Sequence, residues 1–329
     1  MNGCQRQKPD RREFLRKATW TGAGLLVLGR PLWGAEQPAE PLPTRVLGRT
    51  KAKVTLLGLG TAPIGEGPVG VQEGARIFGE VLDRGVTYVD TARSYGTAEE
   101  ALSLVLPKRR DQLFLVTKLW TESGAQAQKL FETSLRTLRV DYLDLVHIHN
   151  VGGKDPAKVL AKDGILEYLL KQKEAGKLRF IGLSGHERPP RFLEVLKTGQ
   201  IDVVMGVMNY ADCNIYGFES KVLPECRKQD VGVVAMKVYV GIKGGFPNHR
   251  KGSVGCVTKP ELLPQAMAYA LDLEGVSVAS IGPYTMEQAI QNVEFARRYK
   301  PLTDDERTKL LALGKQIAAE IGPRYGPIA

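Results

Sequence analysis

The stretch Val86-Thr-Tyr-Val-Asp90-Thr-Ala-Arg-Ser-Tyr95-Gly96 carries most of the fold prediction. Its apolar, β-branched beginning predicts a buried strand that ends at Asp90. Tyr95 then lies on the loop that leaves this strand. In an α/β barrel the active site forms at the C-terminal ends of the strands, so both side chains would face it. The alternative is a helix-capping aspartate followed by a surface tyrosine.

Two further apolar runs end in groups that can take part in acid–base chemistry. Leu113-Phe-Leu-Val-Thr-Lys118 ends in lysine, and Tyr142-Leu-Asp-Leu-Val-His147-Ile-His149 ends in histidine. A single lysine at the end of a strand is typical of a side chain that reaches out to solvent. Three successive strand ends with a carboxylate, a phenol, an ammonium and an imidazole favour one shared site.

With these motifs the chain resembles the aldo/keto reductase family. The family pattern D-x-A-x-x-Y-G corresponds to Asp90–Gly96, V-x-T-K to Leu115–Lys118, and D-Y-x-D-L-x-x-I-H to Asp141–His149. The similarity covers nearly everything from Thr44 to Ile321. It implies a (β/α)8 TIM barrel, a nicotinamide dinucleotide cofactor and hydride transfer at a carbonyl or alcohol carbon.

The order of predicted elements agrees with a barrel of eight βα units. The runs 44–48 and 54–57 predict an N-terminal β-hairpin that leads into the first strand. Strands are then expected to end near residues 90, 118, 149, 184, 208, 237 and 281, with amphipathic helices between them. Thr303-Asp-Asp-Glu306 has the pattern of a capping box and predicts an extra C-terminal helix. The barrel domain is therefore placed at 44–321, with a tail at 322–329.

The N-terminus has the pattern of an export signal. Arg11-Arg12 and Phe14-Leu15 precede a mildly apolar segment that contains glycine. This predicts a twin-arginine signal peptide over residues 1–35 and a Pro-rich linker over 36–43. The protein is then expected to use the twin-arginine export machinery and to reside in the periplasm, or to stay tethered to the membrane if the leader is not cleaved. A cut is expected near Ala35, although Trp33 occupies a position where a small residue is preferred, and the alternative for the whole segment is a basic amphipathic or disordered tail.

Composition excludes several classes of protein. The chain has 329 residues, of which 43% are hydrophobic and 25% charged, as in ordinary globular proteins. It has no run of eighteen apolar residues, so no transmembrane helix is expected. Residues 1–35 contain seven basic and two acidic residues. Their net charge of +5 is half of the formal charge of +10 of the whole chain. The remaining charge is scattered, which argues against nucleic acid as a partner.

Cysteine spacing argues against a metal centre. Cys4, Cys213, Cys226 and Cys256 are isolated, and no C-x-x-C motif occurs. Zinc and iron–sulfur sites usually need such motifs, so no metal is expected. A disulfide between Cys213 and Cys226 remains open.

The residue types at the strand ends suit carbonyl reduction. The carbonyl oxygen needs a proton donor as negative charge develops on it. A tyrosine with an unperturbed pKa near ~10 needs assistance, which a neighbouring ammonium held by a carboxylate can provide. The resemblance assigns the general acid/base to Tyr95, its support to Lys118 and Asp90, and carbonyl orientation to His149. His147, on the same strand face, is expected to be a hydrogen-bonded barrel-interior histidine, with a second catalytic group as the alternative.

The resemblance also implies a set of dinucleotide-binding residues, with four departures from the family pattern. Glycine replaces asparagine at 185, methionine replaces glutamine at 205 and tyrosine at 236, and tyrosine replaces arginine at 284. The last change weakens the usual preference for a 2′-phosphate, so NADP(H) is favoured and NAD(H) is the alternative. The cofactor-binding residues expected are Gly60, Thr61, Ser184, Gly185, Met205, Met236, Lys237, Gly282, Tyr284, Gln288 and Asn292.

Two long loops and two aromatic residues are candidates for the walls of the site. The Gly-rich, basic loop 241–255 is either a lid over the pyrophosphate or a solvated loop. The loop 150–163 beside His149 is expected to shape substrate access. Trp120 and Tyr210 are candidates for the substrate pocket, with rim packing as the alternative.

The sequence thus predicts an NAD(P)H-dependent oxidoreductase acting on a small aldehyde, ketone or sugar-like substrate. One alternative is an enzyme that retains its NAD(P) and catalyses a redox-neutral reaction of sugars. Another is a redox-sensing module that keeps the fold and binds a protein partner.

Overall fold

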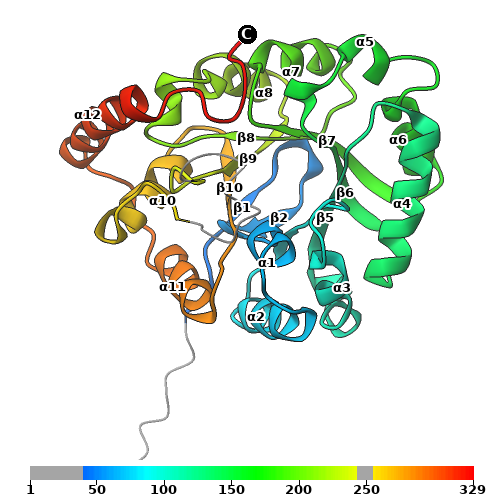
Figure 1. The fold of residues 1–329 in the computed structure, drawn as a ribbon, viewed down its shortest axis with the longest axis horizontal. Coiled ribbons are helices and arrows are strands. Elements are labelled where there is room, and N and C mark those ends of the chain that lie inside the picture. The colour runs from blue at the N-terminus through cyan, green and yellow to red at the C-terminus, as the bar shows by residue number, and fades with distance from the viewer. Residues whose placement is uncertain (1–39, 243–254) are drawn as a thin grey trace, which may run out of the picture. The chain divides into compact units, whose positions relative to one another are not determined.

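A computed structural model of the chain describes residues 40–242 and 255–329. Eight strands in this part close into a parallel barrel in the order β10-β3-β4-β5-β6-β7-β8-β9. Helices surround the strands, as Figure 1 shows. This confirms the predicted (β/α)8 TIM barrel. The predicted signal peptide, residues 36–39 of the linker, and residues 243–254 of the predicted lid lie outside the described residues.

Strands and helices alternate along the chain as predicted. The barrel strands are β3 (Leu57–Gly60), β4 (Tyr88–Asp90), β5 (Phe114–Leu119), β6 (Leu143–Ile148), β7 (Leu178–Gly185), β8 (Val203–Val207), β9 (Gly232–Met236) and β10 (Val276–Ile281). The main helices between and after them are α2 (Val71–Asp83), α3 (Ala98–Ser103), α4 (Gly124–Leu138), α6 (Ile165–Glu174), α7 (Pro189–Leu196), α8 (Leu223–Lys228), α10 (Leu263–Leu271), α11 (Met286–Arg297) and α12 (Asp304–Ile321).

An antiparallel hairpin precedes the barrel, as predicted. It consists of β1 (Thr44–Val46) and β2 (Lys53–Thr55), with Arg45 opposite Val54. Leu47 and Val54 pack with barrel-interior residues such as Val203 and Val234, so the hairpin covers one end of the barrel. Gly48 has φ of +47°, and a Cβ there would lie 2.3 Å from the Gly232 nitrogen, so only glycine fits this turn.

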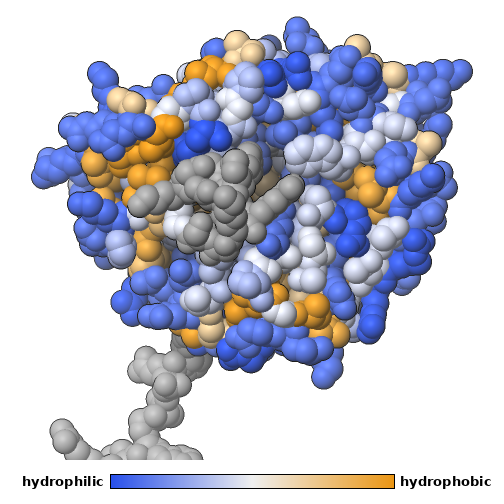
Figure 2. Space-filling view, viewed as in Figure 1, coloured by the Kyte–Doolittle hydropathy of each residue, from blue (hydrophilic) through white to orange (hydrophobic). Residues whose placement is uncertain are grey.

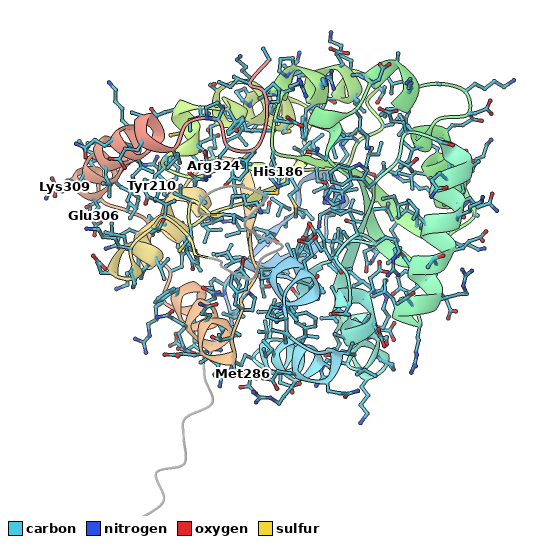
Figure 3. All side chains as sticks on the ribbon, in the orientation of Figure 1. His186, Tyr210, Met286, Glu306, Lys309 and Arg324 are labelled. Atoms are coloured by element: carbon cyan, nitrogen blue, oxygen red, sulfur yellow. The ribbon has the colours of Figure 1, made fainter. Side chains whose placement is uncertain are left out.

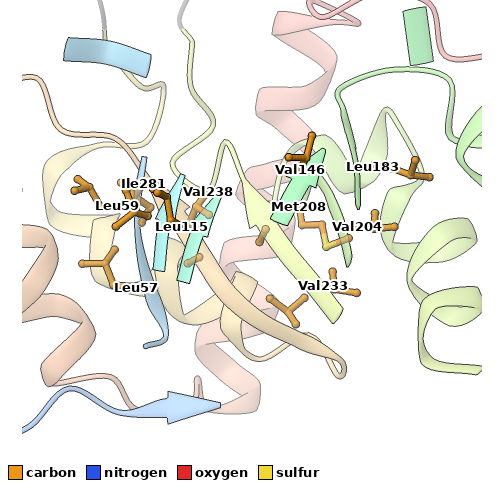
Figure 4. Packing of buried hydrophobic residues seen from close by; sticks show 14 of the residues in the cluster. Leu57, Leu59, Leu115, Val146, Leu183, Val204, Met208, Val233, Val238 and Ile281 are labelled. Atoms are coloured by element: carbon orange, nitrogen blue, oxygen red, sulfur yellow. The ribbon is translucent and has the colours of Figure 1, made fainter. Parts of the chain in front are cut away.

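Alternate residues of each strand face opposite sides, which divides the hydrophobic core into two layers. Tyr88, Phe114, Val116, Leu145 and Met205 fill the interior. A larger cluster lies between the strands and the helices, and Figure 4 shows part of it; it includes Leu57, Leu59, Leu115, Val146, Leu183, Val204, Met208, Val233, Val238 and Ile281. Each fully buried Leu, Ile or Val contributes about 1.5–3 kcal/mol, which makes this layer the main source of stability.

Short elements that periodicity did not reveal occur in the loops. α1 (Ala62–Glu66) follows β3, and α5 (Pro156–Val159) lies within the loop after β6. The segment predicted as a helix from 218 begins with a π-helical turn over Phe218–Val222. These segments are too short to show a periodic hydrophobic pattern.

The predicted capping box of the last helix is confirmed. The Thr303 hydroxyl accepts a hydrogen bond from the Glu306 backbone N–H, and the Glu306 carboxylate accepts one from the Thr303 N–H. The outer surface of the surrounding helices is mainly hydrophilic in Figure 2. Within residues 40–242 and 255–329, no helix is long and apolar enough to cross a membrane.

Candidate active site

Four polar side chains meet at the ends of β4, β5 and β6. Asp90 is the last residue of β4, and Lys118 is the next-to-last residue of β5. Lys118 Nζ donates to Asp90 Oδ2 at 2.6 Å and to the Thr91 carbonyl at 2.9 Å. Both side chains are nearly sealed from solvent, since Lys118 is 1% and Asp90 5% exposed. The pair is a buried, hydrogen-bonded ion pair.

Tyr95 and His149 complete the group. The Lys118 Nζ lies 4.6 Å from the centroid of the Tyr95 ring. The rings of Tyr95 and His149 are 5.7 Å apart and nearly perpendicular, at 83°. The structure therefore brings together all four residues that the sequence predicts as catalytic.

A close approach of two loops positions Tyr95. Gly96 has φ of +46°, and a Cβ there would lie 2.2 Å from the Gly65 carbonyl oxygen in α1. A Cβ added to Gly65 would likewise lie 2.2 Å from the Tyr95 carbonyl oxygen. Glycine at both positions lets α1 pack against the β4 loop, which explains the glycine that follows Tyr95 in the motif.

Burial controls the charge states of these groups. It raises the pKa of Asp90 and lowers the pKa of Lys118, while each partner opposes the shift of the other. Burial, Asp90 and Glu66 together hold the pKa of Tyr95 well above its ordinary value. Desolvation of the phenolate is the largest of these causes. Tyr95 is therefore a protonated phenol at neutral pH.

His147 in β6 and His149 directly after this strand are neutral for the same reason. Burial, followed by the charge of Lys118, holds the pKa of both His147 and His149 well below the ordinary value. His147 lies in the barrel interior as predicted, level with Lys118 and Gly182 in the strand register. A Cβ on Gly182 would come within 2.4 Å of the His147 Nδ1, so glycine provides room for the imidazole.

A cavity of about 450 Å³ extends from Asp90 and Tyr95 across the ends of β8, β9, β10 and β3. It is large enough to hold a substantial part of a dinucleotide. The predicted cofactor residues that line it are Gly60, Thr61, Met205, Met236, Lys237, Gly282, Tyr284, Gln288 and Asn292. Ser184 and Gly185 are not part of its lining.

Hydrogen bonds hold two of these residues in place at the β10 end. The Gln288 Oε1 accepts the Tyr284 backbone N–H at 2.8 Å, and Asn292 Oδ1 accepts the Tyr239 hydroxyl at 2.9 Å. A Cβ on Gly282 would lie 2.4 Å from Pro63 Cδ, so glycine permits the contact between β10 and α1. α11 begins just beyond this point, and its free N–H groups can bind an anion.

Phe192 accounts for the glycine at position 185. A Cβ on Gly185 would lie 2.9 Å from Phe192 Cζ, so the ring of α7 occupies the space that a side chain would need. Ser184, in contrast, has a buried Oγ without a hydrogen-bond partner in the described part of the chain. It lies level with Met205 in the strand register, and Met205 lines the cavity.

Lys237 presents a positive charge to the cavity. Its backbone is left-handed, with φ of 59°, directly after β9. The pKa of Lys237 is lowered to about 8, mainly by burial; the charges of Lys118 and Arg324 act in the same direction, and Glu66 opposes the shift. The ammonium is thus charged at neutral pH and placed to contact an anionic ligand.

The two aromatic residues predicted for the substrate pocket differ. The Trp120 ring is 55% exposed and contacts the edge of His149, with centroids 5.0 Å apart. Tyr210, like Trp120, does not line the cavity described above. It is fully buried, its hydroxyl bonds Thr258 at 3.0 Å, and its backbone packs against Gly314 of α12.

The C-terminal tail contributes to the rim of the site, which the sequence did not reveal. Arg324 forms two hydrogen bonds to the buried Asp212 carboxylate, at 2.7 and 2.8 Å. The Tyr325 ring lies 5.5 Å from the His186 ring, and its hydroxyl donates to the Gly241 carbonyl. His186 and Gly241 both line the cavity. Figure 3 labels His186 and Arg324 in this region.

Comparison with known proteins agrees with this arrangement. The profile of the aldo/keto reductase family matches residues 56–251. An L-galactose dehydrogenase of Arabidopsis thaliana is 25% identical over 298 residues, which cover 80% of this chain and 91% of the relative. An uncharacterized oxidoreductase of Bacillus subtilis is 24% identical over 309 residues, covering 83% and 96%.

Solved structures show the same fold. The holo form of an aldo-keto reductase from Bacillus halodurans superimposes with a TM-score of 0.67 at 26% identity, covering 83% of this chain and 96% of that protein. An aldo/keto reductase from Klebsiella pneumoniae, solved with NADP and acetate, gives a TM-score of 0.65 at 24% identity, covering 83% and 95%. With this fold and a family match over more than half of its length, the chain belongs to the aldo/keto reductase family.

Proposed function

We propose that this protein is an NAD(P)H-dependent oxidoreductase that interconverts a carbonyl and an alcohol on a small aldehyde, ketone or sugar-like substrate. The main support is the placement of Tyr95 at the end of the cavity, with the buried Lys118–Asp90 pair beneath it and His149 beside it. The proton donor, the ion pair that supports it and the group that contacts the carbonyl thus lie together at one end of the cavity.

The cavity residues fit a nicotinamide dinucleotide. The unpartnered Ser184 Oγ suits the carboxamide, and the partly buried Met236 can pack on the nicotinamide ring. Gly282 and the start of α11 suit a phosphate, and Asn292 suits the adenine. When bound, the nicotinamide supplies or accepts the hydride.

The proton is handled by the chain itself. Tyr95 donates its proton to the carbonyl oxygen, and its raised pKa ensures that the proton is present at neutral pH. The Lys118 ammonium stabilises the resulting phenolate, and Asp90 holds that ammonium in position. The neutral His149 imidazole orients the carbonyl oxygen by a hydrogen bond.

The expected ligand is NADP(H), the usual choice in the family, with NAD(H) as the alternative. Tyr284 stands at the position where relatives carry an arginine for the 2′-phosphate, and Lys237 supplies a cation to the same cavity. Titration with both dinucleotides, followed by protein fluorescence, gives the ratio of the two dissociation constants. A lower value for NAD(H) would reverse this assignment.

Replacing Tyr95 by phenylalanine tests the assignment of the proton donor. No protein group in the described residues bonds the Tyr95 hydroxyl, so Tyr95→Phe should leave folding and dinucleotide affinity nearly unchanged. Loss of general acid catalysis should lower the rate about 10²–10⁴-fold. The measurement is aldehyde-dependent oxidation of the reduced dinucleotide. A variant that works at a near wild-type rate would show that Tyr95 is not the proton donor.

We further propose that residues 1–35 act as a twin-arginine signal that exports the folded protein to the periplasm. The proposal rests on Arg11-Arg12 and the apolar segment after them. Replacing both arginines by lysine should leave the precursor in the cytoplasm, still able to bind dinucleotide, and cell fractionation reads this out. N-terminal sequencing of the exported wild type then distinguishes cleavage from a tethered, uncleaved leader. Export of the double variant would contradict the proposal.

A further inference from the structure

The loop after β6 holds a lysine in an unusual setting. Directly after His149 the chain turns left-handed at Asn150, with φ of 55°, and a short 3-10 turn over Val151–Gly153 leads to Lys154. Lys154 is only 6% exposed. Lysine is rarely buried to this degree unless a carboxylate pairs with it.

Lys154 has no such carboxylate partner. Among the described residues, no carboxylate lies within 4.0 Å of the Lys154 Nζ and no hydrogen bond from it is formed, so its contacts there are with solvent and the indole of Trp120. Glu122 is the acid that acts on it, but one Glu122 carboxylate oxygen is already bonded to the Asp155 backbone N–H at 2.7 Å. Burial accordingly lowers the pKa of Lys154, and Glu122 only partly offsets the shift. The ammonium is therefore short of an anionic partner.

The loop that holds Lys154 is fixed by two arginines. Arg188 and Arg191 both donate to the Gly152 carbonyl, at 3.1 and 3.0 Å, and Arg191 also donates to the Lys154 carbonyl. Gly152 packs so closely on the Glu187 backbone that a Cβ would lie 2.1 Å from its carbonyl oxygen. The Lys154 backbone is thus held in place, which is what a binding residue needs.

Trp120 connects the ammonium to the reacting centre. The Lys154 Nζ lies 5.3 Å from the centroid of the indole, and the indole lies 5.0 Å from the His149 ring. Nζ is thus no farther from the His149 ring than the sum of these two distances. Neither Trp120 nor Lys154 lines the dinucleotide-sized cavity, and both lie near His149, at the β6 end of the barrel mouth.

We propose that Lys154 forms an anion subsite for the substrate and that the carbonyl compounds this enzyme handles are short oxo acids. The inference rests on the proposed function and names its substrate class. One ammonium beside the open indole face matches a single carboxylate, with the indole covering the apolar carbons between carboxylate and carbonyl. With carbon–carbon bonds near ~1.5 Å, a chain of about four to six carbons fits between the Lys154 Nζ and the His149 ring.

The test compares two aldehydes that differ only in charge, 4-oxobutanoate and its methyl ester. Wild type should show a higher kcat/KM for the acid. Lys154→Met should lower the value for the acid about 10- to 100-fold, the size expected for one charge-assisted hydrogen bond, and leave the ester unchanged. Lys154→Arg should keep the preference. Lys158→Met is the matched control, because it removes a charge from an exposed position of the same loop.

A binding readout separates this inference from the proposed function. The chain has three tryptophans, at 20, 33 and 120, so replacing Trp20 and Trp33 by phenylalanine leaves Trp120 alone. Its fluorescence should change on titration with 4-oxobutanoate and not with the ester, and Lys154→Met should abolish the change. Binding without turnover would retain the subsite and refute the proposed reaction.

Two outcomes would overturn the subsite itself. One is equal kcat/KM and equal fluorescence response for acid and ester in the wild type. The other is an equal loss of activity toward both compounds in Lys154→Met, which would show a purely structural lysine.

Discussion

Removing one partner of the Lys118–Asp90 pair should cost much more stability than removing the charges of both. In Lys118→Met the Asp90 carboxylate stays in a site that is 5% exposed and loses its 2.6 Å contact. Breaking a buried ion pair on one side costs about 3–5 kcal/mol. Since each kcal/mol lowers the Tm of a large domain by roughly 2–4 °C, Tm should fall by at least about 6 °C.

The double variant Asp90→Asn with Lys118→Met should recover most of this loss, because it leaves no unpaired charge and keeps a similar volume. Both variants should lack activity, so the experiment separates the effect on stability from the effect on catalysis.

The pH dependence of stability is a second check on Lys118→Met. Burial already raises the pKa of Asp90, and without Lys118 it rises further. The folded state then binds more protons than the unfolded state above the ordinary carboxyl pKa of about 4, so stability falls as pH rises.

Urea unfolding at pH 5 and pH 8 measures these free energies. The loss in free energy of unfolding of Lys118→Met relative to wild type should be larger at pH 8 than at pH 5. Equal losses in the single and double variants would refute the reasoning, because they would show that the lost packing matters and the unpaired charge does not. A single-variant loss below about 1 kcal/mol would refute the buried placement of the pair.

Three further predictions follow from buried charges near the site. Dinucleotide affinity should fall as pH rises through about 8, where Lys237 loses its proton, and Lys237→Met should flatten this profile in fluorescence titrations; an unchanged profile would remove Lys237 from the binding site. Burial raises the pKa of Glu219 to about 7, so above that pH the folded protein carries a buried carboxylate, and the desolvation of this charge lowers its stability. Glu219→Gln, which can still accept the Tyr269 hydroxyl, should therefore raise the free energy of unfolding at pH 8 and change it little at pH 4.5; equal effects at both would contradict a raised pKa. Arg324→Met removes the two hydrogen bonds that Arg324 donates to the buried Asp212 carboxylate, so the C-terminal tail should become sensitive to carboxypeptidase, as mass spectrometry would show. A tail as resistant as wild type would mean that this pair does not anchor it.

The alternation of strands and helices was accessible from the sequence because local patterns encode it. The strand Val276–Ile281 and the helix beginning at Met286 occur where the apolar run and the following polar periodicity predict them. Parallel strands in a barrel end on the same side, so the strand ends at Asp90 and Lys118 had to meet once the barrel was recognised. The meeting of the four polar groups was therefore predictable without coordinates.

The direction of the Tyr95 pKa shift was not predictable from neighbours along the chain. Residue types suggested support from Lys118, whereas the largest cause of the shift is desolvation by the surrounding fold. Burial depends on all segments that pack around the ring, including α1, which no periodicity revealed. The same holds for Tyr210, whose position beneath α12 depends on a contact between residues 210 and 314.

The sequence by itself thus determined the barrel, its hairpin and its last helix, and the residues at the strand ends, because hydrophobic periodicity and strand direction are local properties. Only the tertiary structure decided which residues border the site from distant segments. Tyr325 reaches His186 across 139 positions of the chain, and Lys154 reaches Trp120 across 34. Such contacts follow from the packing of loops at the barrel mouth, for which the sequence has no repeating signal.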